Sequence, residues 1–362
     1  MARSAVTAYA PVNATTRALY STLLTPEVRH ALVQAPNFDV LLAQLDKTVY
    51  GPYLEINREL LNPRRTAYQL RLHLTHVYEK LIRITPEPGQ QILIQLWRLY
   101  EVDNLKATLR GIETGASWNE VLHLLSPMFH YITLTTDDIQ RMLATGSIVR
   151  AIERIRHTPY YDTLIHAVAR YETEKNLFPL EVALDLDYRR GLWQSIESLT
   201  GTDHEQALRL VGTEIDADNL LWAIRYRVYH HLSVQEIINY TLPFGYKVRD
   251  EDIRAIAGGE DIITVVKRIY PHIETLEDIP AQTREEISPQ RRQLALIERA
   301  LRRHIIDLCH KTFIGNPFHI GIPIAYIMLL ERELQDLTAI VEANASQLPI
   351  ERLASIIDIE WW

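Results

Sequence analysis

The feature that most constrains this chain is a short polar pattern that returns at nearly constant intervals. The pattern is an acid, an Asn or Asp three residues later, and then a leucine. It occurs at Glu101–Asn104–Leu105, at Asp216–Asn219–Leu220 and at Glu333–Asp336–Leu337. The Asn or Asp positions lie 115 and 117 residues apart. Self-similarity at a fixed period indicates a repeated structural element, and it sets the frame for every other assignment.

A pair of short helices also repeats along the chain. The three copies are residues 24–54, 134–160 and 249–270, and each has a cap signal, a turn and a second apolar stretch at helical spacing. The first two copies match at an offset of 110 residues, which also pairs Tyr50 with Tyr160. The third copy matches the second at an offset of 114 residues. The chain therefore reads as three related repeats, each with a helix pair followed by longer helices.

The apolar spacing between these markers is that of helices. Thr66–Ile84 and Gln290–Lys311 carry apolar residues at steps of three and four, and no run alternates long enough for a convincing strand. We predict an all-α protein whose parts are residues 1–130 (an extension, helical from near Asn13, and repeat 1), 131–244 and 245–362. Ile279–Pro289 is expected to be an acidic, polar linker.

Composition excludes several classes of protein. A formal charge of −8 argues against a general nucleic-acid binder, which usually carries a basic stripe. The single cysteine, Cys309, allows no intramolecular disulfide, so a reducing compartment is expected. The start of the chain lacks the apolar core of a secretory signal. The most apolar stretch, Phe313–Leu330, contains two prolines, an asparagine and a histidine, and it suits a buried loop and core helix better than a membrane span.

The repeated acid and Asn or Asp lie on one face of a helix, together with the leucine. Polar groups on such a face need hydrogen-bond partners, so we expect Glu101, Asp216 and Glu333 to hold each repeat together. The alternative is that they line an inner surface and touch a partner. The first interpretation is favoured.

No motif for catalysis or ligand binding is present. The thirteen glycines form neither a phosphate-binding loop nor a dinucleotide fingerprint, and no G-x-S-x-G elbow occurs. His73 and His76 share a helix face, but no third metal ligand suggests itself. Cys309 lies among apolar residues, as expected of a buried, inert thiol. We therefore predict no catalytic, cofactor or metal site.

Several sequence motifs of this chain resemble those of a known family, the central-stalk C subunits of prokaryotic V/A-type ATPases. The eukaryotic counterpart of that family is the d subunit of the V-ATPase. The resemblance covers essentially the whole chain, and five weak motifs occur in the right order. They are the opening Tyr9, Asn13, Ala14, Arg17, Leu23 and Leu24; the T-x-Y-G segment within Leu45–Leu54; the two D-x-x-N-L-type helices with Arg110 and Arg225; and the segment with Pro317, Gly321, Ala325, Tyr326 and Glu331. The departures are the crowding of Glu101 and Asp103 before Asn104, and the terminal Trp361–Trp362.

The resemblance implies a funnel of three pseudo-symmetric helical repeats with a central cavity. Such a subunit would join the central-stalk subunits of the catalytic head to the membrane proteolipid ring. It would be a peripheral part of the complex at the cytoplasmic face, with no nucleic acid, no cofactor and no span of its own. It would not be an enzyme, because ATP chemistry and ion transport would happen in other subunits.

Two other classes stay open. A helical-repeat scaffold could bind unrelated proteins, although solenoid repeats usually run 20–50 residues and these are about 115. An all-α enzyme with dispersed catalytic residues is the third possibility.

Overall fold

The chain is all-α, as its apolar spacing predicts. The computed structural model describes residues 5–55, 60–127, 131, 133–273, 289–350, 352–353 and 357, and within them the regular elements are helices. The linker expected at Ile279–Pro289 lies, apart from Pro289, outside these residues. No helix of the described part is both long enough and apolar enough to cross a membrane.

The chain falls into two compact units. One contains Met1–Tyr9 and Ile196–Leu329, and the other contains Ala10–Ser195 and Leu330–Glu360. We call them the smaller and the larger unit. The division into three repeats is a division of the sequence, and it stays a prediction.

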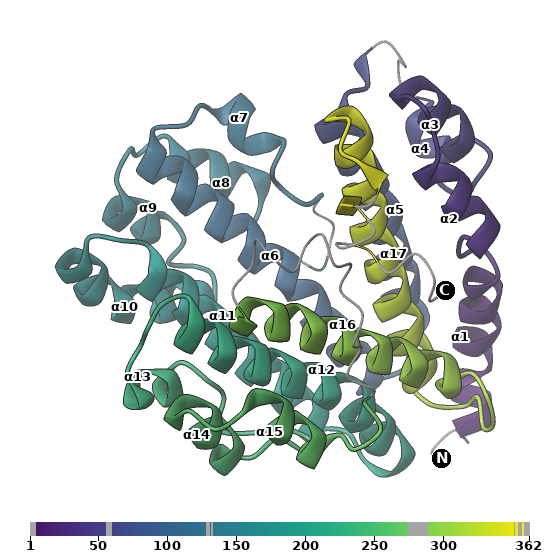
Figure 1. Ribbon diagram of the computed structural model, residues 1–362. Helices are drawn as coiled ribbons and strands as arrows, with labels where there is room; N and C mark the ends of the chain where they lie inside the picture. The colour runs from purple at the N-terminus through teal and green to yellow at the C-terminus, as the bar shows by residue number, and fades with distance from the viewer. Residues whose placement is uncertain are drawn as a thin grey trace. The chain divides into compact units, whose positions relative to one another are not determined.

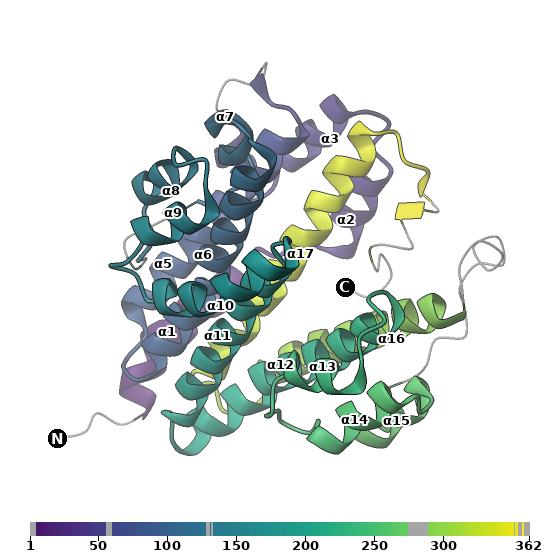
Figure 2. The ribbon, with the colours of Figure 1, turned by 90° about the vertical axis from the view of Figure 1, so that its left-hand side faces the viewer.

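The larger unit is built around two long antiparallel neighbours, α5 and α6, with shorter helix pairs against them (Figures 1 and 2). Its core contains Trp97, Tyr78 and Tyr50, which are almost completely buried. The helices are α2 (Pro26–Val33), α3 (Phe38–Leu45), α4 (Gly51–Leu54), α5 (Pro63–Ile84), α6 (Gly89–Thr114), α7 (Trp118–Leu122), α8 (Thr136–Leu143), α9 (Ile148–Arg154), α10 (Tyr160–Glu174) and α11 (Phe178–Glu197), of which the last two residues belong to the smaller unit.

The smaller unit packs two long helices, α12 and α16, side by side (Figure 2). A pair of short helices, α14 and α15, contacts these two long helices, and α13 packs on α14. The bounds are α12 (Gly201–Val228), α13 (Val234–Asn239), α14 (Asp250–Gly258), α15 (Ile262–Ile269) and α16 (Pro289–Thr312).

Two further helices run from one unit into the other. These are α1 (Ala5–Tyr20) and α17 (Gly321–Ala345). The first begins at Ala5, earlier than the start near Asn13 that the sequence suggests, and it contains Pro11. Proline lacks an amide hydrogen and usually interrupts a helix. The sequence pattern therefore gives no indication of the helical turns before Pro11. Tyr9 and Val12 are nevertheless buried, and their burial favours a continuous helix across the proline.

Local capping explains where the repeated short helices begin. The side chain of Thr25 accepts from the Val28 amide before Pro26 begins α2. Thr135 and Asp138 form a reciprocal capping box at the start of α8, with N–O distances of 3.0 and 3.1 Å. Asp252 accepts from the Arg249 amide at 2.9 Å at the start of α14. These bonds satisfy amides that a helix start leaves unpaired, and the two aspartates therefore act as caps.

Candidate functional site

Glu101 is a buried acid on α6, and it binds a segment that follows it in the chain. Its carboxylate accepts hydrogen bonds from the Tyr160 hydroxyl at 2.7 Å, the Thr133 amide at 3.1 Å and the Thr133 hydroxyl at 2.9 Å. The side chain is about 1% exposed, so these donors replace water. Burial and the adjacent carboxylate raise the pKa of Tyr160, which keeps its hydroxyl protonated as the donor.

Asp216 holds the same position on α12. It accepts from the Tyr270 hydroxyl at 2.6 Å and from the Lys247 amide at 2.7 Å. Burial raises the pKa of Asp216, and the hydrogen bonds from Tyr270 and the loop backbone oppose that shift. The loop approaches so closely that a Cβ on Gly245 would lie 2.2 Å from Asp216 Oδ1. Glycine at position 245 is therefore required by the space available.

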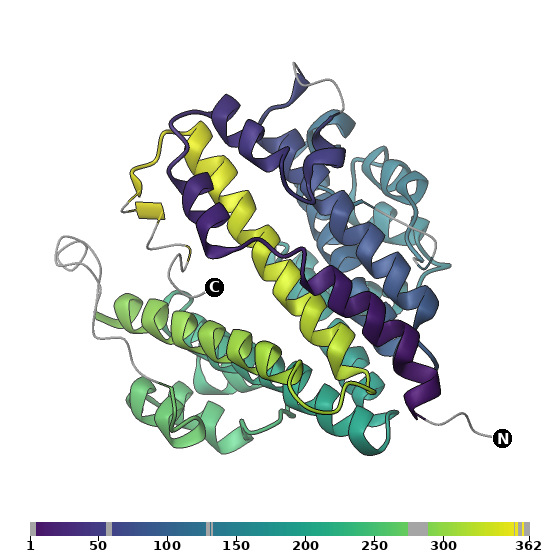
Figure 3. The same cartoon turned by 90° about the vertical axis from the view of Figure 1, so that its right-hand side faces the viewer.

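Glu333 on α17 is the third acid, and it adds a buried cation. It accepts from the Tyr50 hydroxyl at 2.6 Å and the Leu24 amide at 2.8 Å, and it forms an ion pair with Arg29 on α2. In Figure 3 the purple α2 lies beside the yellow C-terminal part of α17. Burial raises the pKa of Glu333, while Arg29 and Tyr50 favour its ionised form. Burial likewise lowers the pKa of Arg29, which its ion pair with Glu333 counteracts.

These three contacts follow a cyclic order along the sequence. The acid of repeat 1 binds a tyrosine of repeat 2, the acid of repeat 2 binds a tyrosine of repeat 3, and the acid of repeat 3 binds a tyrosine of repeat 1. The tyrosines Tyr50, Tyr160 and Tyr270 are spaced by 110 residues. Each acid also accepts from a backbone amide 23 to 27 residues before its tyrosine. The repeated acid thus joins consecutive repeats.

The asparagine of the pattern holds the loop that follows its own helix. Asn104 Oδ1 accepts from the Ser126 amide at 2.7 Å, and Asn104 Nδ2 donates to the Ser126 carbonyl at 3.1 Å. Asn219 makes the same two contacts with Leu242, at 2.8 and 3.3 Å. Asp336 is about 8% exposed and lies close enough to Arg29 and Glu333 to affect their pKa values. The leucines Leu105, Leu220 and Leu337 are buried.

The predicted positions are therefore brought together with partners that the sequence did not identify. Tyr50 and Tyr160 stood out as matching residues, but helical spacing gives no indication of a contact with a distant acid. The constant offset of the tyrosines was the available signal. A direct contact between these buried acids and another protein stays a prediction.

A fourth acid, Glu331, is named by the resemblance but is not among the predicted site residues. One of its carboxylate oxygens accepts from both the Tyr78 hydroxyl and the Tyr100 hydroxyl, each at 2.7 Å. Burial raises the pKa of Glu331, and the two tyrosines oppose that shift. Repeat 2 has Glu214 at the matching position, two residues before Asp216, whereas repeat 1 has Leu99 there, so the repetition marks this acid only in part.

Charged residues join α6 to α11 within the larger unit. Lys106 contacts Asp185, and the Arg110 guanidinium binds both carboxylate oxygens of Glu181, at 2.6 and 3.0 Å. Asp103 is 54% exposed beside them. Two parallel hydrogen bonds orient an arginine better than a single contact. The Arg110–Glu181 pair therefore helps to orient α11 against α6.

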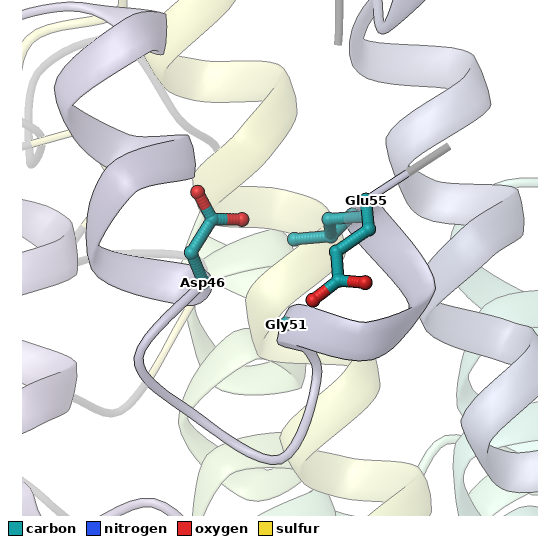
Figure 4. Close-up of a pocket in the computed structure, with 4 residues that line it drawn as sticks. Asp46, Gly51 and Glu55 are labelled. Carbon is teal, nitrogen blue, oxygen red and sulfur yellow. The ribbon is translucent and has the colours of Figure 1, made fainter. Parts of the chain in front are cut away.

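A small hollow lies where α3 turns into α4. It has a volume of about 340 Å³ and is lined by Asp46, Gly51, Leu54 and Glu55 (Figure 4). A Cβ on Gly51 would lie 2.3 Å from the Asp46 carbonyl oxygen, which explains the glycine. The two carboxylates have no third metal ligand beside them, and the described part of the chain holds no group of three such side chains.

His73 and His76, the histidines that share a helix face, contact tyrosines. His73 is buried, with its ring 5.2 Å from Tyr50 and 5.5 Å from Tyr53, and His76 hydrogen bonds with the Tyr53 hydroxyl at 3.0 Å. Cys309 is about 1% exposed on α16.

Comparison with known proteins places this arrangement in a family. The sequence model of the ATP synthase (C/AC39) subunit family matches residues 12–356. The A-type ATP synthase C subunit of Methanocaldococcus jannaschii is 24% identical over 96% of this chain and 86% of its own length. The proteins of the same name from Desulfurococcus sp. and Thermococcus kodakarensis are each 23% identical over 97% of this chain and 90% of their own lengths.

The match spans all three acid–tyrosine contacts, and it agrees with the resemblance seen in the motifs. The chain belongs to the ATP synthase (C/AC39) subunit family and is a subunit of a rotary ATPase.

Proposed function

We propose that this chain is a non-catalytic central-stalk subunit that couples the rotating stalk of the catalytic head to the membrane proteolipid ring. It would sit peripherally on the cytoplasmic face of the complex, as a funnel that receives the stalk. Membership of the family and the name shared by the relatives support this role.

The observation that carries the proposal is the contact from repeat 3 back to repeat 1. Glu333 binds Tyr50, the Leu24 amide and Arg29, 283 to 309 residues away in sequence. In an open solenoid each repeat contacts only its neighbours, and the last has no link to the first. The returning contact therefore favours a closed body over the solenoid scaffold.

Such contacts suit a part that transmits torque. A coupling element must resist twisting, and compliance between its repeats would absorb the rotation. Each junction here is a buried carboxylate with two or more donors, and opening it would leave the carboxylate unsatisfied. Opening a junction is therefore costly, and the repeats resist movement relative to one another.

A binding experiment tests the role. The purified chain is immobilised and offered, separately, a detergent-solubilised proteolipid ring and a soluble stalk complex from the same source, each at low and moderate salt. We expect the chain to retain both partners. The salt dependence measures the electrostatic share of each contact.

Circular dichroism of the same preparation is the control for folding. A folded, helical chain that retains neither partner would overturn the coupling role and favour a scaffold for unrelated proteins. Retention of one partner alone would contradict coupling, since a coupling element must hold both.

A further inference from the structure

Another hollow of the larger unit lies between the start of α5 and the end of α7, and it has a volume of about 270 Å³. Its described lining comes from residues 60–69 and 122–123, all of which belong to the larger unit. We call it the α5–α7 hollow. No sequence motif marks it, because the two stretches lie far apart in the chain.

Apolar side chains form one part of the α5–α7 hollow. Leu60, Leu61 and Leu122 line it together with Tyr68, and Leu60 is 53% exposed. One exposed leucine is ordinary, but here three leucines surround one concave space. An apolar cavity of about 150 Å³ is large enough to hold benzene. The larger volume of this hollow therefore suits an apolar body of about two fused rings.

The polar side chains on α5 line the same hollow and offer hydrogen-bond donors. Arg65, Tyr68 and Gln69 follow one another at steps of three and one, so they share one face of the helix. Burial raises the pKa of Tyr68, more than the nearby Arg71 lowers it, so its hydroxyl keeps its proton at neutral pH. The side chain of Gln69 makes no hydrogen bond within the described residues, and its Oε1 is buried. Its Nε2 is therefore the amide atom that a ligand can reach.

Arg65 supplies a positive charge whose position is fixed locally. One guanidinium nitrogen donates to the Leu60 carbonyl at 3.1 Å, and the Arg65 amide donates to Asn62, the cap of α5, at 3.0 Å. None of the described lining residues is an aspartate or glutamate. The first turn of a helix also carries the positive end of its dipole. The polar part of the hollow thus favours a group that is negative and only accepts hydrogen bonds.

We propose that the α5–α7 hollow binds a small carboxylic acid with an apolar body of about two rings. The body lies against Leu60, Leu61 and Leu122, and the carboxylate faces Arg65 and Gln69. An ionised carboxylate accepts hydrogen bonds and donates none, which matches the donors on α5. This inference goes beyond the coupling role and does not depend on it.

The test uses three probes that share one apolar body and differ in the charge of the head group. Naphthylacetate is negative, naphthylacetamide is neutral and naphthylethylamine is positive at neutral pH. Each is titrated into the full chain and followed by ligand-observed NMR. We expect a Kd of about 0.1–1 mM for naphthylacetate, as for other ligands of this size. The amide should bind about five-fold more weakly, and the amine should show no measurable binding.

Two variants locate the binding site. Arg65→Gln should weaken naphthylacetate about five-fold and leave naphthylacetamide unchanged, because only the charged head uses the guanidinium. Leu122→Trp should abolish binding of both probes by filling the hollow. Arg64→Gln is the matched control, since Arg64 is the exposed neighbour of Arg65 and is not among the lining residues. Circular dichroism reports the folding of each variant.

Three results would overturn the proposal. They are no binding of naphthylacetate at millimolar concentrations, equal affinity for the three head groups, and unchanged affinity in folded Arg65→Gln and Leu122→Trp. A loss in Arg64→Gln as large as that in Arg65→Gln would likewise assign the effect to the general charge of this end of α5. A chain that binds naphthylacetate as expected but retains neither the ring nor the stalk complex would keep this site and defeat the coupling role.

Discussion

His73 is a buried histidine whose surroundings favour its neutral form. Its ring lies edge-on to Tyr50 and Tyr53, and its Nε2 has no hydrogen-bond partner among the described residues. Burial, with a smaller contribution from His76, lowers the pKa of His73 from 6.5 to about 4. In the unfolded chain the ordinary value returns.

This shift predicts an acid-sensitive stability. Between pH 6.5 and about 4 the unfolded chain binds a proton that the folded chain does not, so the free energy of unfolding falls as the pH falls through this window. Below it the loss is complete, at about 3 kcal/mol for a shift of this size. His73→Phe should remove this loss. Urea unfolding of wild type and variant at pH 7, 5.5 and 4.5 measures the difference.

The experiment compares the pH dependence of the free energy of unfolding in wild type and variant, because other groups change that free energy in the opposite direction. The raised pKa values of Asp216 and Glu333 add stability as the pH falls, and they do so equally in wild type and variant. His30→Phe, at an exposed position of α2, is the control. A pH dependence that His73→Phe leaves unchanged would show that His73 is not the source.

At the residue scale, the sequence predicts which positions matter better than what they contact. Repetition identifies Glu101, Asp216 and Glu333. Their place on an apolar helix face indicates that each acid needs a hydrogen-bond partner. It does not identify Tyr160 as the donor, since helical periodicity reports neighbours on one helix and no distant segment. Glu331 with Tyr78 and Tyr100 is harder still, because repeat 1 has Leu99 at the matching position and only Glu214 of repeat 2 keeps an acid there.

At the element scale, the apolar spacing predicts the long helices well. The stretch Thr66–Ile84 lies within α5 and Gln290–Lys311 lies within α16, close to the observed bounds. Cap residues predict where the short helices begin, because a cap acts over only three or four residues and is visible in the local sequence. The predicted start of α1, near Asn13, is wrong. Pro11 interrupts the local sequence pattern, whereas tertiary burial of Tyr9 and Val12 favours the helix.

The left-handed residues that follow α6, α12 and α17 within three residues allow a prediction about the turns after these helices. Gly115 adopts its φ at no steric cost, whereas His231 and Gln347 are strained by it. Gly115→Ala should destabilise by about 1 kcal/mol, and His231→Gly and Gln347→Gly should each stabilise by about 0.5–1 kcal/mol. Urea midpoints measured at constant m-value compare the three variants.

Gly258→Ala serves as the control for this series. Gly258 ends α14 without a left-handed φ, and a Cβ there meets open space. Alanine at 258 should therefore be neutral or stabilising. If Gly115→Ala were tolerated equally well, the left-handed turn at 115 would not be needed for stability.

At the scale of the whole molecule, three sequence repeats and two compact units describe the same chain differently. Each acid binds a tyrosine of the following repeat, so buried hydrogen bonds join the repeats. Sequence repetition identifies the copies but gives no boundary in space. The link from Glu333 to Tyr50 is the one that an open chain of repeats would lack, so its removal tests whether closure matters for function.

Glu333→Gln should uncouple the rotary complex. The change removes the carboxylate that forms the ion pair with Arg29, which is about 6% exposed, and breaking one partner of a buried pair typically costs about 3–5 kcal/mol. The junction between repeats 3 and 1 would then open under load. In the reconstituted complex we expect ATP hydrolysis to continue while ion transport per ATP falls several-fold. Hydrolysis and transport are measured on the same proteoliposomes.

Glu342→Gln is the matched control, because Glu342 is an exposed acid on the same helix. It should keep the ratio of transport to hydrolysis, which separates loss of the junction from loss of a charge on α17. Assembly is checked by the amount of the variant chain in the purified complex. Unchanged coupling in a fully assembled Glu333→Gln complex would mean that torque passes without this junction, and stiffness would then have to come from the long helices alone.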